Sequence, residues 1–311
     1  NGVVWAYMGD AAEPPPLPEI EFNLVPSENV FVSFRVQECN WLQALEGEID
    51  SAHAPILHGR IDGKGSINNW IAAQDLQPKF DCKRRDFGVS IASSRVVDEN
   101  TSYWRVNQFI APFWTLVPPQ AKFPELSGHA WVPIDDENTL CLMFSYTPVG
   151  PLYPKTREVL ANGHRGRETG HASGGVYEPQ NPTTPYSDFR TKFRPDNGFG
   201  FDYESQQTSW FSGLPGLWVQ DAACQSGVMP IYDRTQENLC ATDAGIILTR
   251  RMLLDSVTAF RDEGTRPIGA DEPETFMVRA VSMHMPVEAN WEQAAAEPMT
   301  ARLGADFGYD L

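Results

Sequence analysis

Short segments that alternate apolar and polar residues constrain the fold of this chain more than any other feature. One lies at 29–38, where Val-Phe-Val-Ser-Phe-Arg-Val-Gln-Glu follows the period of two expected of a half-buried strand. A meander of further strands is predicted between 78 and 147, at 87–92, 101–109, 115–117, 130–133 and 139–146. The clearest helix is predicted over 242–262, with Gly264 as its stop signal. Strands followed by one long helix predict an α+β domain, in which an antiparallel sheet packs on a long C-terminal helix.

Composition excludes several classes of protein. The 311 residues are 41% hydrophobic, which is enough for a large core, and the formal charge is −17. A chain this acidic repels nucleic acid and anionic membrane surfaces, so we expect neither as a partner. No apolar run approaches the roughly 20 residues that span a bilayer, and no secretory leader opens the sequence. Five scattered cysteines indicate free thiols in a reducing compartment, which predicts a cytoplasmic protein.

The ends of the pattern suggest how the chain is divided. Residues 1–9 are predicted to be a strand that is already under way, and residues 10–20 a stiff proline-rich linker. We therefore expect a preceding domain in the natural protein and a main domain over 21–311. Residues 148–200 are rich in Pro, Gly, Asn, Ser and Thr, which predicts a long loop insertion that is either functional or disordered.

A helix with two histidines near its end is the most informative segment. Residues 40–53 place apolar side chains at helical spacing behind Asn40, a favourable N-cap. Pro55 is expected to end or kink this helix near Ala54.

The histidines of this segment are candidate metal ligands. Asp50 and His53 share a helix face, whereas His58 would point about 140° away from His53 on a regular helix. A break at Pro55 removes that obstacle and allows both imidazoles to reach one ion. Asp50 could then receive a ring N–H from His53. The spacing alone favours zinc as much as iron, and it leaves open that the two histidines bind no metal.

The segment also resembles a known family. Asp50-Ser-Ala-His53-Ala-Pro-Ile-Leu-His58, after the helix opening Cys39-Asn-Trp-Leu-Gln, resembles the catalytic domain of Rieske non-heme iron aromatic-ring oxygenases. It is most similar to the phthalate dioxygenase and aromatic O-demethylase branch. Supporting matches are the strand-like start at 1–9 and the segment 231–251. The fold implied is the helix-grip, the START/Bet v1-like arrangement of sheet and long helix.

The resemblance implies roles for individual residues. His53 and His58 would bind a mononuclear Fe(II), and Asp243 would complete a facial triad of two histidines and one carboxylate. Asp50 would be catalytic, as the bridge for electrons from a neighbouring subunit. Asp221 and Asp233 are competitors for the carboxylate position. Asp243 is favoured because it opens the long helix, where a side chain can be held rigidly toward the sheet.

The implied activity is O2-dependent hydroxylation or O-demethylation of an aromatic, carboxylated substrate. A reductase would supply electrons, and the assembly would be a homotrimer. The family's Rieske domain should carry C-x-H and C-x-x-H ligands to a [2Fe–2S] cluster, and neither motif occurs here. We therefore expect the isolated chain to be inactive without that domain. Two alternatives are a zinc enzyme that uses the same histidines and a non-catalytic helix-grip binding module.

Candidate pocket residues come from the meander. Three aromatic residues could line an apolar pocket: Phe109, Phe113 and Trp114. Four arginines could bind a carboxylate, although each is more readily explained as a surface charge: Arg84, Arg85, Arg95 and Arg105. The sequence singles out none of the four.

Overall fold

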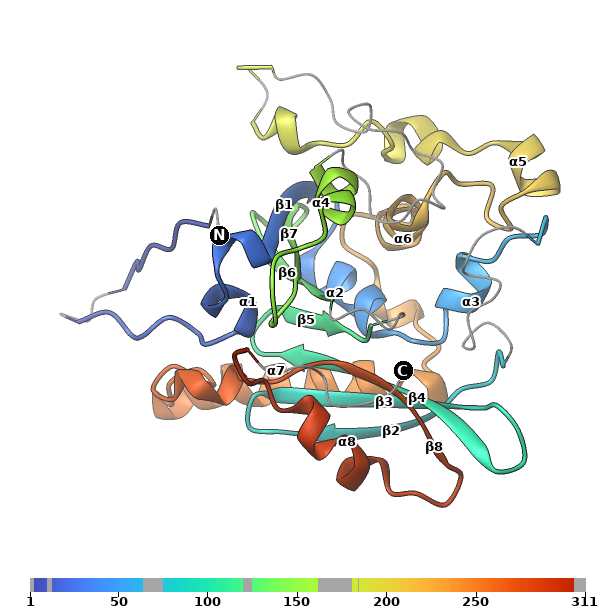
Figure 1. Ribbon diagram of the computed structural model, residues 1–311. Coiled ribbons are helices and arrows are strands. Elements are labelled where there is room, and N and C mark those ends of the chain that lie inside the picture. Colours follow the sequence, from blue (N-terminus) through green and yellow to red (C-terminus); the bar gives the residue numbers. More distant parts are fainter. Residues whose placement is uncertain are drawn as a thin grey trace.

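An antiparallel sheet of eight strands forms the centre of the molecule, and helices cover it (Figure 1). The computed structural model describes residues 3–9, 13–63, 75–119, 125–161, 181–183 and 185–304. The strands are β1 (Val30–Gln37), β2 (Lys79–Arg84), β3 (Gly88–Val96), β4 (Thr101–Ile110), β5 (Trp114–Val117), β6 (Leu126–Pro133), β7 (Thr139–Tyr146) and β8 (Val281–Pro286). The helices are α1 (Glu21–Leu24), α2 (Trp41–Ile49), α3 (Ala54–Leu57), α4 (Pro154–Ala161), α5 (Tyr203–Thr208), α6 (Leu217–Ser226), α7 (Ala244–Glu263) and α8 (Trp291–Met299).

The strands run in the order β1-β7-β6-β5-β4-β3-β2, and β8 joins at β4. All pairings are antiparallel: one end of β4 pairs with β5 and the other end pairs with β8. The predicted α+β class and the predicted meander are therefore confirmed. The prediction missed β2 and β8, because β2 is short and rich in charged residues and β8 lies far along the chain in a segment of mixed composition.

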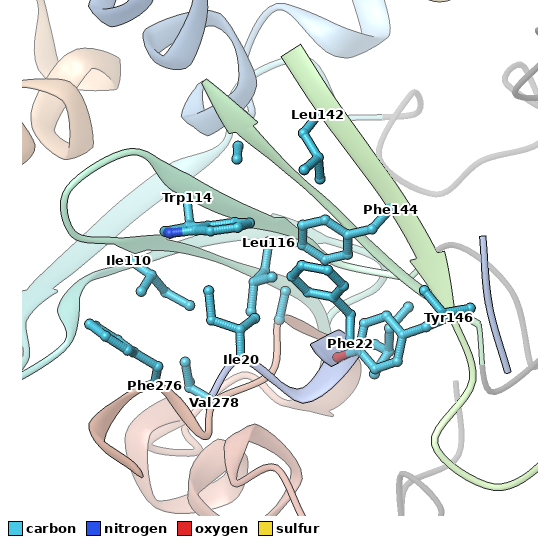
Figure 2. Close-up of a cluster of buried hydrophobic side chains, with 14 of the residues drawn as sticks. Ile20, Phe22, Ile110, Trp114, Leu116, Leu142, Phe144, Tyr146, Phe276 and Val278 are labelled. Atoms are coloured by element: carbon cyan, nitrogen blue, oxygen red, sulfur yellow. The ribbon is translucent and has the colours of Figure 1, made fainter. Parts of the chain in front are cut away.

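The two faces of the sheet carry separate cores, since successive side chains of a strand point to opposite faces. Phe109 packs with α2 and α7, whereas the next residue, Ile110, packs on the other side with the segment around α1. Figure 2 shows this second cluster, in which Phe22 stacks on Phe144 with ring centroids 4.1 Å apart. Trp114 is buried in the same cluster. Phe109 and Trp114 are therefore core residues, and Phe113 packs against both clusters.

Helix α7 confirms the strongest helix prediction. It ends at Gly264, whose φ of 66° is a left-handed conformation that favours glycine. It packs along β2 and β3 (Figure 1). Its start lies very close to the sheet, because a Cβ on Gly245 would lie 2.8 Å from Ile91 Cγ2. A larger residue at Gly245 would therefore push the helix away from β3.

A buried ion pair joins the two ends of the domain. Glu21 and Arg279 are 0% and 2% exposed, and Arg279 donates from Nε and Nη2 to the two carboxylate oxygens at 2.7 and 2.5 Å. The Tyr146 hydroxyl also donates to Glu21, at 3.0 Å. The segment before β1 is thereby fixed to the segment before β8.

Several local predictions differ from the structure. Residues 3–9 contain no strand, so the strand predicted over 1–9 is absent from its described part. Helix α2 ends at Ile49, several residues before the expected break, because the Asp50 side chain accepts backbone N–H groups of the following turn. Pro55 lies in the first turn of α3 and opens a helix instead of ending one.

The predicted loop at 148–200 contains helix α4 and two short 3-10 turns in its described part. Its residues 162–180 and 184 lie outside the described residues. Among the described helices, none is long and apolar enough to cross a bilayer.

Candidate metal centre

Helix α3 holds the two histidines of the predicted site. His53 precedes its first residue and His58 follows its last. A single four-residue helix thus separates them, and their rings meet edge to face, with centroids 5.3 Å apart and planes at 80°. His58 is buried, and His53 is 26% exposed at its side chain. The predicted break at Pro55 is absent, because the helix runs unbroken between the two histidines and brings their rings together across about one helical turn.

Helix α6 supplies the carboxylate. Asp221 Oδ1 lies 3.4 Å from His53 Nε2 and 3.2 Å from His58 Nε2. One ligand atom from each of the three residues fits within 4.8 Å of the others. Figure 1 shows α6 next to α2, with α3 nearby. This close approach depends on Gly47 in α2, where a Cβ would lie 2.1 Å from the Gln225 side chain.

Hydrogen bonds orient both imidazoles in the same sense. His53 Nδ1 lies 3.1 Å from Asp50 Oδ2, and His58 Nδ1 lies 2.7 Å from Gln220 Oε1. Gln220 is fully buried, and its amide nitrogen donates to the Leu214 carbonyl at 3.0 Å, which fixes its oxygen toward His58. Each Nδ1 therefore carries a proton, and each Nε2 points at the position beside Asp221.

The charges of the cluster are strongly coupled. Burial lowers the pKa of His53, but the hydrogen bonds and charges of Asp221 and Asp50 outweigh it and raise this pKa to about 10. Burial raises the pKa of Asp221, yet the two histidines hold it far below its usual range. The pKa of Asp50 is also lowered, against its burial, by the hydrogen bond and charge of His53. Both carboxylates are therefore anionic at neutral pH, and the pair attracts a cation.

Asp243, the carboxylate expected from the sequence, is not brought to the histidines. Its side chain accepts the backbone N–H of Cys240 at 2.7 Å, inside the 3-10 turn that precedes α7. Asp233 likewise caps a turn, by accepting the N–H of Thr235 at 3.0 Å. Both carboxylates are therefore bonded to backbone N–H groups of their own turns. The residue beside the histidines is Asp221, which the sequence analysis had ranked behind Asp243.

Helix α6 was not predicted from the sequence, and this explains why Asp221 was placed behind Asp243 as the candidate carboxylate. The sequence signal for α6 was the pair of glycines that flank it, Gly216 and Gly227. Val219 and Ala222 lie on its buried side. Recognising it would have placed Gln220 and Asp221 side by side within one regular element. Its weak amphipathic character hid it, since polar residues also face the interior there.

A groove of about 960 Å³ opens beside the cluster. His53, Asp50 and Asp221 lie in its wall, and several apolar side chains complete it: Ile56, Leu57, Phe211, Val228 and Ile246. The described residues of the meander contribute nothing to this lining. The expectation that Phe109, Phe113 and Trp114 line the pocket is thus not met for this groove, because these residues pack in the cores.

The four candidate arginines of the meander also lie elsewhere. Arg95 and Arg105 are 1% and 3% exposed, so reading them as surface charges was wrong. Arg95 donates to the Ser51 carbonyl at 2.6 Å and thereby fixes the turn after Asp50. Two outer arginines pair with acidic residues, Arg84 with Asp255 and Arg85 with Glu292. The groove is lined by none of the four.

Comparison with known proteins agrees with this arrangement. The family model described as "LigXa C-terminal domain like" matches residues 6–307. This chain belongs to that family. The chain is 30% identical over 298 residues to the 3-chlorobenzoate-3,4-dioxygenase oxygenase subunit of Comamonas testosteroni. The match covers 94% of the chain and 68% of that relative. It is 31% identical over 288 residues to the phthalate 4,5-dioxygenase oxygenase subunit of Pseudomonas putida, covering 88% and 60%.

A third relative is the 5,5'-dehydrodivanillate O-demethylase oxygenase subunit of a Sphingobium strain, 26% identical over 310 residues, covering 97% of the chain and 59% of that relative. The chain thus spans about three fifths to two thirds of the length of these three relatives. The resemblance to the catalytic domain of Rieske-type oxygenases that the sequence indicated is confirmed.

Proposed function

We propose that this chain binds Fe(II) through His53 Nε2, His58 Nε2 and the Asp221 carboxylate, and that it oxidises an aromatic substrate with O2. The observation that supports the proposal is the convergence of these atoms, with Asp221 Oδ1 at 3.4 and 3.2 Å from the two ring nitrogens. Two imidazoles and one carboxylate are the donor set of non-heme Fe(II) oxygenases, in which iron keeps open positions and supplies O2 activation. The three residues present therefore fit the ion that the family implies.

The surroundings of the donor set suit this task. Asp50 and Gln220 fix both imidazoles with Nε2 available, so little reorganisation is needed when a cation binds. The raised pKa of His53 keeps its Nε2 protonated without a metal, so a binding cation would displace that proton, and two anionic carboxylates and neutral imidazoles would then balance a divalent charge. Both His53 and Asp50 line the groove. We assign Asp50 the role expected from the sequence, as the group through which an electron donor is linked to His53.

The groove is the proposed substrate site. Its apolar side chains, among them Leu57 and Phe211, can enclose a planar ring, and His53 and Asp221 lie in the same wall. The relatives act on 3-chlorobenzoate, phthalate and 5,5'-dehydrodivanillate according to their names, which supports an aromatic acid as substrate. Both ring hydroxylation and O-demethylation occur among them, and both are compatible with one metal centre beside one ring.

Electron supply and assembly follow from the same proposal. The relatives are oxygenase subunits, so we propose that a reductase system supplies electrons through a [2Fe–2S] cluster held outside this chain. We also propose a homotrimer, in which electrons cross between subunits to Asp50. Light scattering of the natural full-length protein tests the trimer, and a monomer at micromolar concentration would argue against it.

The experiment that tests the proposed function is spectroscopic. The protein is loaded anaerobically with Fe(II) and exposed to nitric oxide, which binds to iron that has an open position and gives a high-spin electron paramagnetic resonance signal. We expect this signal in the wild type and its loss in Asp221→Ala and His53→Ala. Its absence from folded, iron-treated wild type would refute the proposal, and stoichiometric zinc would favour the zinc enzyme instead.

A further inference from the structure

We propose that Arg234 binds the carboxylate of an aromatic acid in the groove and so determines which substrates enter. This inference rests on the proposed function, because it concerns the ligand of the same site. Arg234 lies in the 3-10 turn Arg234–Gln236, between α6 and α7. No motif in the sequence marked it as a binding residue.

A frame of buried ion pairs holds Arg234 in place. Arg250 on α7 uses all three of its nitrogens: Nε and Nη2 donate to Glu46 at 2.6 and 2.8 Å, and Nη1 and Nη2 donate to Glu237 at 2.7 and 2.8 Å. Glu46 lies on α2 and its side chain is 10% exposed. Both glutamates are thereby fixed from one side. The resulting frame joins α2, α7 and the segment between α6 and α7.

Arg234 completes this frame with only one of its nitrogens. Its Nη1 donates to Glu46 Oε2 at 2.6 Å and to Glu237 Oε1 at 2.8 Å. Within the described part of the chain, its Nε and Nη2 donate to no group. The side chain is 34% exposed and lies in the groove wall. A guanidinium anchored at one nitrogen and open along the Nε–Nη2 edge is prepared for a two-point contact with a carboxylate.

The charges of the groove leave this role to Arg234. The charges of the two glutamates and two arginines of the frame cancel, whereas Asp50 and Asp221 in the same wall are anionic, so the unbonded edge of Arg234 is where the frame offers an arriving carboxylate a cationic contact. Arg234 is the only arginine or lysine among the described residues that line the groove. Leu57, Phe211 and Ile246 line the same groove and can pack on the ring of the acid. Because the same groove contains His53, one end of a ligand fixed at Arg234 can lie beside the proposed metal.

Binding of two matched probes tests this inference. Benzoate and its neutral analogue benzamide are titrated into the wild type, Arg234→Gln, Arg234→Lys and a control, Arg84→Gln, by isothermal calorimetry. Arg84 is an exposed arginine on β2 that pairs with Asp255 outside the groove. We expect Arg234→Gln to weaken benzoate binding roughly 10- to 100-fold and to change benzamide binding less than about 2-fold. Arg234→Lys should be intermediate, because a lysine supplies charge without the planar fork.

Three results would overturn the inference. These are benzoate affinity that is unchanged in Arg234→Gln, equal losses for benzoate and benzamide, and wild type that binds neither probe at millimolar concentration. Benzamide binding also reports that the groove of each variant is folded, and thermal melting of each variant provides a second check.

Failure of the proposed function is distinguishable from failure of this inference. Iron is measured in the same samples. If the wild type binds no iron but still distinguishes benzoate from benzamide through Arg234, the result would contradict the proposed chemistry and support carboxylate binding by Arg234. If the wild type binds iron at the triad but does not distinguish the two probes through Arg234, the result would support the proposed chemistry and contradict carboxylate binding by Arg234.

Discussion

Gln220→Ala should weaken metal binding although Gln220 is not a ligand. The fully buried amide accepts from His58 Nδ1 at 2.7 Å and donates to the Leu214 carbonyl at 3.0 Å. Its removal leaves two buried polar groups without these partners, at a cost of about 1–3 kcal/mol each, so the free energy of unfolding should fall by about 2–6 kcal/mol. The His58 ring also loses the contact that fixes its orientation. Loss of such a contact typically lowers metal affinity about 10- to 100-fold.

The assay separates these two effects. Urea unfolding of the metal-free protein gives the free energy of unfolding, and competition with a chelator under anaerobic conditions gives the Fe(II) affinity. Gln225→Ala is the matched control, because Gln225 lies on the same helix and bonds to Gln37 but contacts neither histidine. We expect the control to lower stability and to retain Fe(II) affinity. Unchanged affinity in Gln220→Ala, or an equal loss in both variants, would refute the argument.

Three further predictions concern stability and reactivity. Glu21→Ala should lower the free energy of unfolding by about 3–5 kcal/mol, because it leaves the Arg279 guanidinium buried and uncompensated; denaturant titration measures this, and a loss below about 1 kcal/mol would contradict it. Leu45→Ala should cost about 2–5 kcal/mol in the same measurement, since the side chain is fully buried between α2 and the sheet, and an unchanged midpoint would show that the site collapses without cost. Burial raises the pKa of the Cys39 thiol to about 11, so iodoacetamide at pH 8 should label the exposed Cys240 far faster, and Cys39 should gain reactivity only as the pH approaches 11; equal rates at pH 8 would contradict this.

The sequence predicted the parts of the fold that depend on local pattern. Strand β1 and helix α7 could be predicted from the spacing of their apolar residues, and Gly264 ends α7 because glycine adopts its left-handed backbone conformation readily. By contrast, β2 is short and mostly charged, and α6 buries polar residues such as Gln220, so neither has a clear apolar pattern. Their formation depends on tertiary contacts that no local window contains.

The site shows the same division. His53 and His58 were found because both lie in one short segment, although the break expected at Pro55 is replaced by the short helix α3. The carboxylate comes from a helix more than 160 residues further along, and its selection depends on how α6 packs against α2. Sequence spacing cannot supply that packing. Asp243 was preferred because it opens the long helix, where a side chain can be held rigidly toward the sheet, whereas Asp221 is the carboxylate beside the histidines in the structure.

The most direct test of the account is the metal content of the anaerobically purified protein, measured by inductively coupled plasma mass spectrometry. Wild type and Asp243→Ala are compared with His53→Ala and Asp221→Ala. The account predicts roughly one iron per chain in the first two and loss of iron in the last two, with all four proteins folded by circular dichroism. Iron retained in folded Asp221→Ala but lost in Asp243→Ala would contradict the proposed triad and restore the carboxylate expected from the sequence.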